Sequence, residues 1–150
     1  NVKNFILIGL ISFTFVGCAG SGLKTYGEYI FATKNSEYSN VVIYRPSAFV
    51  GGGTIFTVTL NGLELGKLGN NEFIIGEIQD GRNYLNIKVG GIQGVGINKL
   101  GKSFKKTTNS NIYFQVSYTY DSMNTFGPVN LKIVINEIPF NQFRALVSKQ

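Results

Sequence analysis

Alternation of apolar and polar residues dominates the chain from about residue 40 onward. Phe56, Val58 and Leu60 alternate with polar residues, which is the period of two expected of a half-buried strand. Similar patterns predict strands at Val41–Tyr44, Thr54–Leu60, Leu63–Leu68, Phe73–Ile78, Arg82–Val89, Lys102–Thr108, Ile112–Tyr120 and Val129–Ile135. Short strands at such regular spacing favour a β-sandwich or a barrel.

Turn-forming residues separate the predicted strands. Asn61-Gly62 is the strongest short signal for a two-residue hairpin, and Asn70-Asn71 and Asp80-Gly81 predict further tight turns. The glycines between residues 90 and 101 predict a mobile loop, because they lack the spacing and the Lys-Ser/Thr pair of a phosphate-binding loop.

The C-terminal segment has a different period. Phe140, Phe143 and Val147 recur at helical spacing behind Pro139, which predicts a short helix lying on the sheet. We therefore expect an all-β protein, an antiparallel β-sandwich of about seven strands, immunoglobulin-like or related, with a short C-terminal helix. No internal repeat or second domain is indicated.

An apolar run, Phe5–Val16, follows Lys3 near the start of the chain. Its length and the preceding positive charge are typical of a secretory signal peptide, whose apolar region spans about 7–15 residues. A transmembrane helix needs about 20 apolar residues, so the run is too short for a permanent span.

The run ends at Phe15-Val16-Gly17-Cys18, which resembles the lipobox of bacterial lipoproteins, with Phe15 where leucine is usual. The resemblance implies that residues 1–17 are cleaved and that the Cys18 thiol carries a diacylglycerol. Two or three acyl chains would anchor the protein to a membrane. The alternative is a free buried cysteine. Ala19, in place of Asp, resembles the pattern of lipoproteins sent to the outer membrane, which here would face the periplasm.

The segment after Cys18 has no clear strand or helix pattern. It begins with small residues, Ala19–Gly22, and continues with tyrosines among polar residues. We interpret residues 18–39 as a flexible tether that merges into a short first strand or turn, and residues 40–150 as the folded domain.

The amino-acid composition limits the kinds of catalysis, metal binding and partner that we expect. The absence of histidine removes the commonest general base and metal ligand, and a single cysteine leaves no internal disulfide or cysteine-rich metal site. We therefore expect a protein without catalytic activity, cofactor or metal. The net charge of +6 favours weak attraction to anionic lipid headgroups or polyanionic glycans, and the predicted export disfavours nucleic acid as a partner.

The chain from about Asn40 resembles the DUF2846 family of small bacterial lipoproteins. The resemblance rests on Tyr44-Arg45-Pro46-Ser47, on Asn61-Gly62 followed by Gly66 and Leu68, and on the turn at Gly81. The family usually has Pro-Gly at that last turn, where this chain has Asp80-Gly81. The resemblance implies a β-sandwich on a lipid tether and no known activity.

Three groups of residues are candidates for chemistry or binding. Arg45, with Tyr44 and Ser47, begins the loop to Gly53 and could grip an acidic partner; the alternative is an arginine with a structural role. A two-residue Asn70-Asn71 turn would place Glu64 across from Glu77, which could hold a cation or share a proton. A basic run could contact lipid headgroups or glycan, or could protect an exposed strand edge from aggregation. It comprises Lys99, Lys102, Lys105 and Lys106.

These observations favour a lipid-anchored envelope protein that works by binding or structural contact, with an envelope protein or a polyanionic glycan as partner. A glycan- or peptidoglycan-binding module is the main alternative, and a carboxylate-dependent wall hydrolase is a weaker one. We also expect the aromatic stripe of Ile112–Tyr120 to be core, and Tyr113, on its other face, to be exposed.

Overall fold

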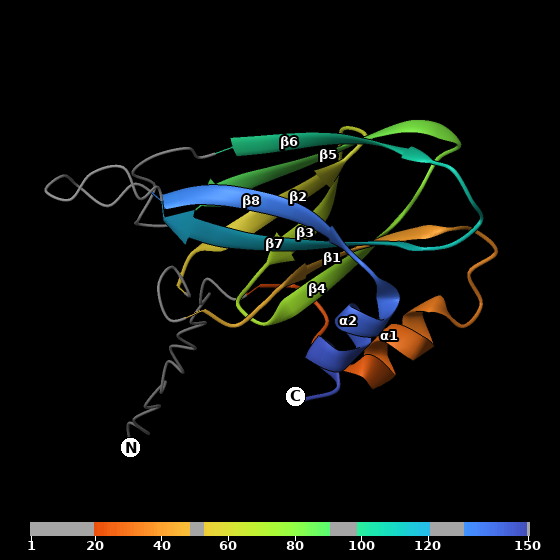
Figure 1. Cartoon of the computed structure of the whole chain (residues 1–150), viewed down its shortest axis with the longest axis horizontal. Helices are drawn as coiled ribbons and strands as arrows, with labels where there is room; N and C mark the ends of the chain where they lie inside the picture. The colour runs from red at the N-terminus through yellow and green to blue at the C-terminus, as the bar shows by residue number, and fades with distance from the viewer. Residues whose placement is uncertain (1–19, 49–52, 91–98, 121–130, 150) are drawn as a thin grey trace, which may run out of the picture.

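The computed structural model describes residues 20–48, 53–90, 99–120 and 131–149. The predicted leader, Cys18, the end of the candidate loop at 49–52 and the glycine-rich segment 91–98 lie outside the described residues. Figure 1 shows two sheets packed face to face, with two helices against the outer side of one of them. The predicted all-β sandwich is confirmed.

Eight strands and two helices make up the described part of the chain. In order they are α1 (Tyr26–Thr33), β1 (Asn40–Arg45), β2 (Ile55–Leu60), β3 (Leu63–Leu68), β4 (Glu72–Glu77), β5 (Gly81–Gly90), β6 (Lys99–Lys106), β7 (Ile112–Tyr120), β8 (Leu131–Ile138) and α2 (Phe140–Val147).

The strands form two four-stranded sheets, with the orders β4-β1-β7-β8 and β3-β2-β5-β6. All neighbours are antiparallel except β1 and β7, which run parallel. The predicted hairpin at Asn61-Gly62 is confirmed between β2 and β3, since both residues adopt the positive φ that such a turn requires.

The connection from β3 to β4 differs from the expected hairpin. Asn71 has a φ of 60°, as a tight turn allows, but β3 pairs with β2 and β4 pairs with β1. The turn therefore carries the chain from one sheet to the other. As a result Glu64 pairs with Thr59, and Glu77 pairs with Asn40 in the opposite sheet. The predicted juxtaposition of the two carboxylates is wrong.

β1 is buried along its whole length because both of its faces are covered. Val41 and Ile43 face the core between the sheets, whereas Val42 and Tyr44 pack beneath the helices. This double burial explains the continuous apolar sequence of β1, which lacks the alternation seen in β2.

The helices form a third layer over the β4-β1-β7-β8 sheet (Figure 1). The ring of Phe143, on the predicted C-terminal helix, is fully buried and contacts Tyr29 of α1 and Tyr113 of β7. The Tyr29 and Tyr113 hydroxyls lie 2.7 Å apart, within hydrogen-bond distance. The expectation that Tyr113 is exposed is wrong, because the two helices cover that face of β7.

The segment before β1 is more ordered than the predicted tether. The Thr25 hydroxyl accepts the backbone N–H of Glu28, and the Glu28 carboxylate accepts that of Thr25, a capping box that begins α1. The Glu28 carboxylate also accepts the N–H of Lys24, and the bonds from these two backbone N–H groups lower the pKa of Glu28. Upstream, the Ser21 N–H donates to the Lys67 carbonyl of β3 at 2.7 Å. The described residues 20–39 are therefore packed on the domain and include a helix.

Candidate binding surface

The structure places the three predicted binding residues in three different environments. Tyr44 lies under the helices, where its hydroxyl donates to Asn71 Oδ1 at 3.2 Å. Arg45 points between the two sheets, and Ser47 is exposed beyond the end of β1. Because neighbouring strand residues point to opposite faces, these side chains do not converge on one site.

Arg45 occupies the interior of the sandwich and is only 2% exposed. Its guanidinium carbon lies 4.2 Å from the centroid of the Phe56 ring, and the group donates to the Thr54 and Leu68 carbonyls. Its register partner on β4 is the buried Glu72. Burial lowers the pKa of Arg45, but the ordinary pKa of arginine is so high that the group stays charged. The placement matches the alternative of a structural arginine.

Glu72 connects the start of the described chain to the sandwich. Its Oε2 accepts the N–H of Gly69 at 2.8 Å and that of Gly22 at 3.2 Å, and Lys24 Nζ lies 3.9 Å from its Oε1. A Cβ atom at Gly20 or Gly22 would lie within 2.8 Å of this side chain. Small residues after Cys18 therefore permit close packing against Glu72, in addition to any flexibility they confer.

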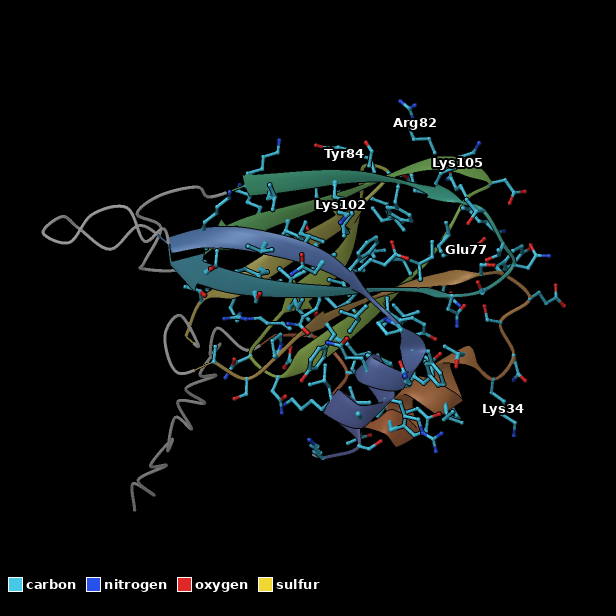
Figure 2. The ribbon with its side chains drawn as sticks, in the orientation of Figure 1. Lys34, Glu77, Arg82, Tyr84, Lys102 and Lys105 are labelled. Carbon is cyan, nitrogen blue, oxygen red and sulfur yellow. The ribbon has the colours of Figure 1, made fainter. Side chains whose placement is uncertain are left out.

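The predicted basic run separates into two pairs with different environments. Lys102 turns toward the interior, where its Nζ donates to the Ile135 carbonyl at 3.1 Å and lies 5.2 Å from the Phe114 ring centroid. Lys106 pairs with Asp80 at 2.9 Å. Lys99 and Lys105 are exposed on the outer side of β6, and Figure 2 shows Lys105 there. Only these two are available to a partner.

Further cations lie near Lys99 and Lys105 on the outer side of the β3-β2-β5-β6 sheet. The inward residues of β5 are buried, so Arg82, Tyr84 and Lys88 point outward. Figure 2 shows Arg82, Tyr84 and Lys105 on the side of the molecule away from the helices. We name this surface the open face and define it by its main outward residues: Arg82, Tyr84, Lys88, Lys99 and Lys105.

Pairing of β5 with β6 places like charges directly opposite each other at two positions. Arg82 is the register partner of Lys105, and Lys88 is the partner of Lys99. Within the described residues none of these four has an ion-pair partner. Like charges opposite each other destabilise a sheet, so the arrangement costs stability in the absence of a bound anion.

Tyr84 lies between the two cationic pairs and is 48% exposed. A Cβ atom at Gly101 would overlap the Tyr84 hydroxyl and lie 3.2 Å from its Cε2, so the ring rests across that glycine. The backbone of Tyr84 is held by Asn61, whose Oδ1 accepts its N–H at 2.8 Å. Nearby, the covered Oδ1 of Asn86 has no hydrogen-bond partner among the described residues. The open face thus presents, between its two cationic pairs, an aromatic ring that lies against Gly101.

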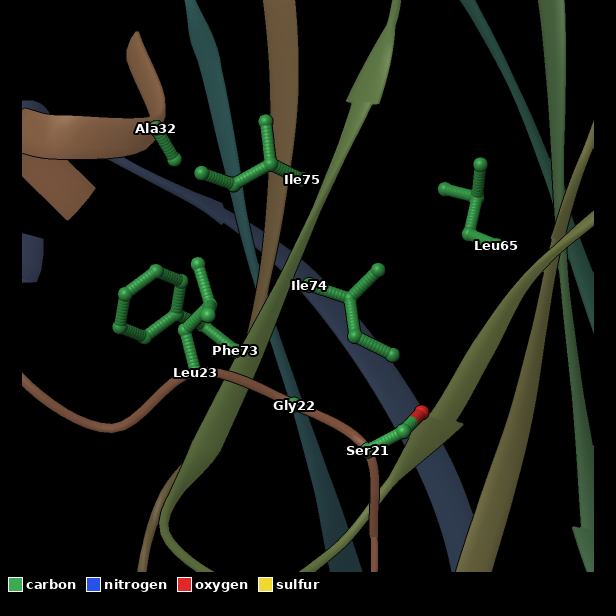
Figure 3. A pocket seen from close by; sticks show the side chains of 8 residues that line it. All are labelled: Ser21, Gly22, Leu23, Ala32, Leu65, Phe73, Ile74 and Ile75. Carbon is green, nitrogen blue, oxygen red and sulfur yellow. The ribbon is translucent and has the colours of Figure 1, made fainter. Parts of the chain in front are cut away.

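A second candidate is an open groove of about 370 Å³ between the N-terminal segment and the edges of β3 and β4 (Figure 3). The side chains that line it are mostly apolar, and the lining residues are Ser21, Gly22, Leu23, Ala32, Leu65, Phe73, Ile74 and Ile75. The one hydroxyl, on Ser21, already bonds to the Lys67 backbone. The groove lacks the convergent polar groups that orient ligands, so the open face is the stronger candidate.

The binding residues predicted from the sequence do not include Arg82, Tyr84 and Lys88. The alternation of β5 contains the signal, since polar residues at these positions oppose the apolar Leu85, Ile87 and Val89. Their pairing with Lys99 and Lys105 depends on the register of β5 and β6, which the composition of either strand does not specify.

Comparison of the chain with protein-family models, curated proteins and solved structures finds no match. The resemblance to the DUF2846 family therefore remains a prediction from the residues that carry it. Within the part of the chain that the structure describes, neither helix is long and apolar enough to cross a membrane.

Proposed function

We propose that this chain is a lipid-anchored protein of the bacterial cell envelope that acts by binding a partner through the open face, without catalysis. The anchor is the Cys18 thiol, and the outer membrane facing the periplasm is the proposed location. The apolar run Phe5–Val16 and the lipobox-like sequence that ends at Cys18 support the anchor.

The proposal that the open face binds a partner rests on its paired cations. Arg82 faces Lys105 and Lys88 faces Lys99 without a described carboxylate between them, whereas Lys102 and Lys106, on the inward side of β6, both have partners. A surface that keeps unfavourable charge pairs beside an exposed tyrosine is suited to an acidic partner. Separation of Glu64 and Glu77 into different sheets removes the predicted basis for a hydrolase.

Replacement of the proposed acyl acceptor tests the anchor. In bacterial cells that express the full precursor, we expect radiolabelled palmitate to enter the parent protein and not Cys18→Ser, which should accumulate as an uncleaved precursor. Ser12→Ala, within the same apolar run, is the matched control and should be labelled and processed normally. Palmitate incorporation into Cys18→Ser would refute lipidation at this residue.

A further inference from the structure

We infer that the partner of the open face is an acidic polysaccharide that lies along β5 and β6. This inference rests on the proposed function and adds the chemical class of the ligand. Its basis is the spacing of the two cationic pairs and the aromatic ring between them.

The two pairs define an elongated site. Arg82 and Lys88 are six residues apart on one strand, which corresponds to about 20 Å at 3.3 Å per residue. Each is matched on β6, by Lys105 and Lys99 respectively. An anion placed between two facing cations relieves their repulsion, and a single molecule relieves it at both ends only if negative charges are repeated along its length. A single small anion would satisfy only one pair.

Tyr84 favours a carbohydrate between these charges. Its ring lies across Gly101 on β6 and is about half exposed, so it offers an apolar surface to the C–H groups of a sugar ring. Ser103, its exposed register partner, adds a hydroxyl that can donate or accept a hydrogen bond. Positive charge alone would be sufficient to bind an anionic bilayer. The Tyr84 ring and the Ser103 hydroxyl between the cationic pairs are better suited to a polymer that is rich in hydroxyl groups.

The position of the N-terminal segment also favours a polymer over the bilayer of the anchor. Ser21 bonds to Lys67, which is in register with Thr57 and, through it, with Lys88. The Arg82–Lys105 pair is at the opposite end of β5, so the open face extends away from Ser21, which is three residues after Cys18 in the sequence. A ligand that engages both pairs must span this length.

Binding of the lipidated protein in neutral detergent to alginate, an acidic polysaccharide, tests the inference. Dextran serves as the neutral polymer. The anionic membrane is a detergent-free vesicle of phosphatidylcholine with phosphatidylglycerol, compared with vesicles of phosphatidylcholine alone, because the acyl anchor inserts into both. The test variant is Arg82→Gln with Lys105→Gln, and a second variant is Tyr84→Ala. The matched control is Lys34→Gln with Lys132→Gln, two exposed cations outside the open face.

We expect alginate to bind and dextran not to bind. The open-face double variant should lose about tenfold in affinity, and the control double variant, with the same net charge, less than about twofold. Tyr84→Ala should weaken alginate binding even at a salt concentration that screens the charges, because stacking is less sensitive to salt. Thermal unfolding of the double variant should be unchanged or slightly higher, since the repulsion is removed.

Equal loss in the two double variants would overturn the inference, because net charge alone would then explain binding. A preference for the phosphatidylglycerol vesicles that the open-face double variant loses and the control variant keeps, without alginate binding, would overturn it in favour of a lipid-contact surface. Absence of alginate binding would also overturn it. In the last two cases palmitate labelling of Cys18 and crosslinking from the open face would still decide the proposed function separately.

Discussion

Arg45→Lys keeps a positive charge at position 45 but removes the planar guanidinium that lies between the sheets. The parent side chain stacks on Phe56 and donates to the carbonyl oxygens of Thr54 and Leu68. A lysine ammonium is compact and lies at the end of a flexible stem, so it cannot match the planar fork and the stack together. The buried Glu72 retains a counter-charge in this variant, which limits the damage.

The expected cost follows from these contacts. A desolvated cation–π contact contributes about 2 kcal/mol, and one hydrogen bond from a charged donor contributes about 1.5–3 kcal/mol. Because lysine retains part of each, we expect Arg45→Lys to lower the free energy of unfolding by about 2–4 kcal/mol. At about 3–5 °C per kcal/mol for a domain of this size, Tm should fall by roughly 10 °C.

Urea unfolding followed by far-UV circular dichroism measures the loss, and alginate affinity is measured on the same samples under native conditions. Arg82→Lys, at an exposed arginine, is the matched control and should change stability by less than about 0.5 kcal/mol. We expect the affinity per folded Arg45→Lys molecule to equal that of the parent. Unchanged stability with reduced affinity would refute the structural role and restore Arg45 as a binding residue.

Two further predictions concern the layer of helices. Burial and the Tyr29 hydrogen bond raise the pKa of Tyr113 above its ordinary value of 10.0, so its stabilising contribution is complete below pH 10 and is lost as the pH rises above it. Urea midpoints should therefore fall less steeply above about pH 10 in Tyr113→Phe than in the parent, and identical slopes would contradict this cause. Phe143→Ala should lower the free energy of unfolding by about 3–5 kcal/mol, because its ring is fully buried and packs against Phe73 of β4. A loss below about 1 kcal/mol in the same urea assay would contradict this packing.

Short sequence motifs were sufficient to predict those features of the fold that depend on residues close together in the chain. Asn61-Gly62 forms its hairpin because both residues tolerate positive φ and the flanking strands remain in one sheet. The capping box of α1 is also local, and the sequence Thr25-Tyr26-Gly27-Glu28 has the spacing that could have revealed it. The same segment has the sequence pattern of a tether because α1 has only one buried residue, Tyr29, and therefore a weak apolar pattern.

The features that the sequence did not predict depend on which elements meet in space. Asn70-Asn71 has turn chemistry, but whether the next strand continues the same sheet is decided by the pairing of β4 with β1. Tyr113 is buried by helices distant in sequence. The inward direction of Arg45 could be inferred from its alternation with Val41 and Ile43, whereas its acceptors on Thr54 and Leu68 could not.

Site-specific photocrosslinking in intact cells tests most directly whether the open face is the binding surface. A photoreactive amino acid at Ser103, the exposed partner of Tyr84, is compared with one at Gln142, which is exposed on α2 beyond the other sheet. We expect adducts of high and heterogeneous mass from Ser103 that resist protease, and few or none from Gln142. Adducts from Gln142 alone, or equal yields from the two positions, would contradict binding through the open face.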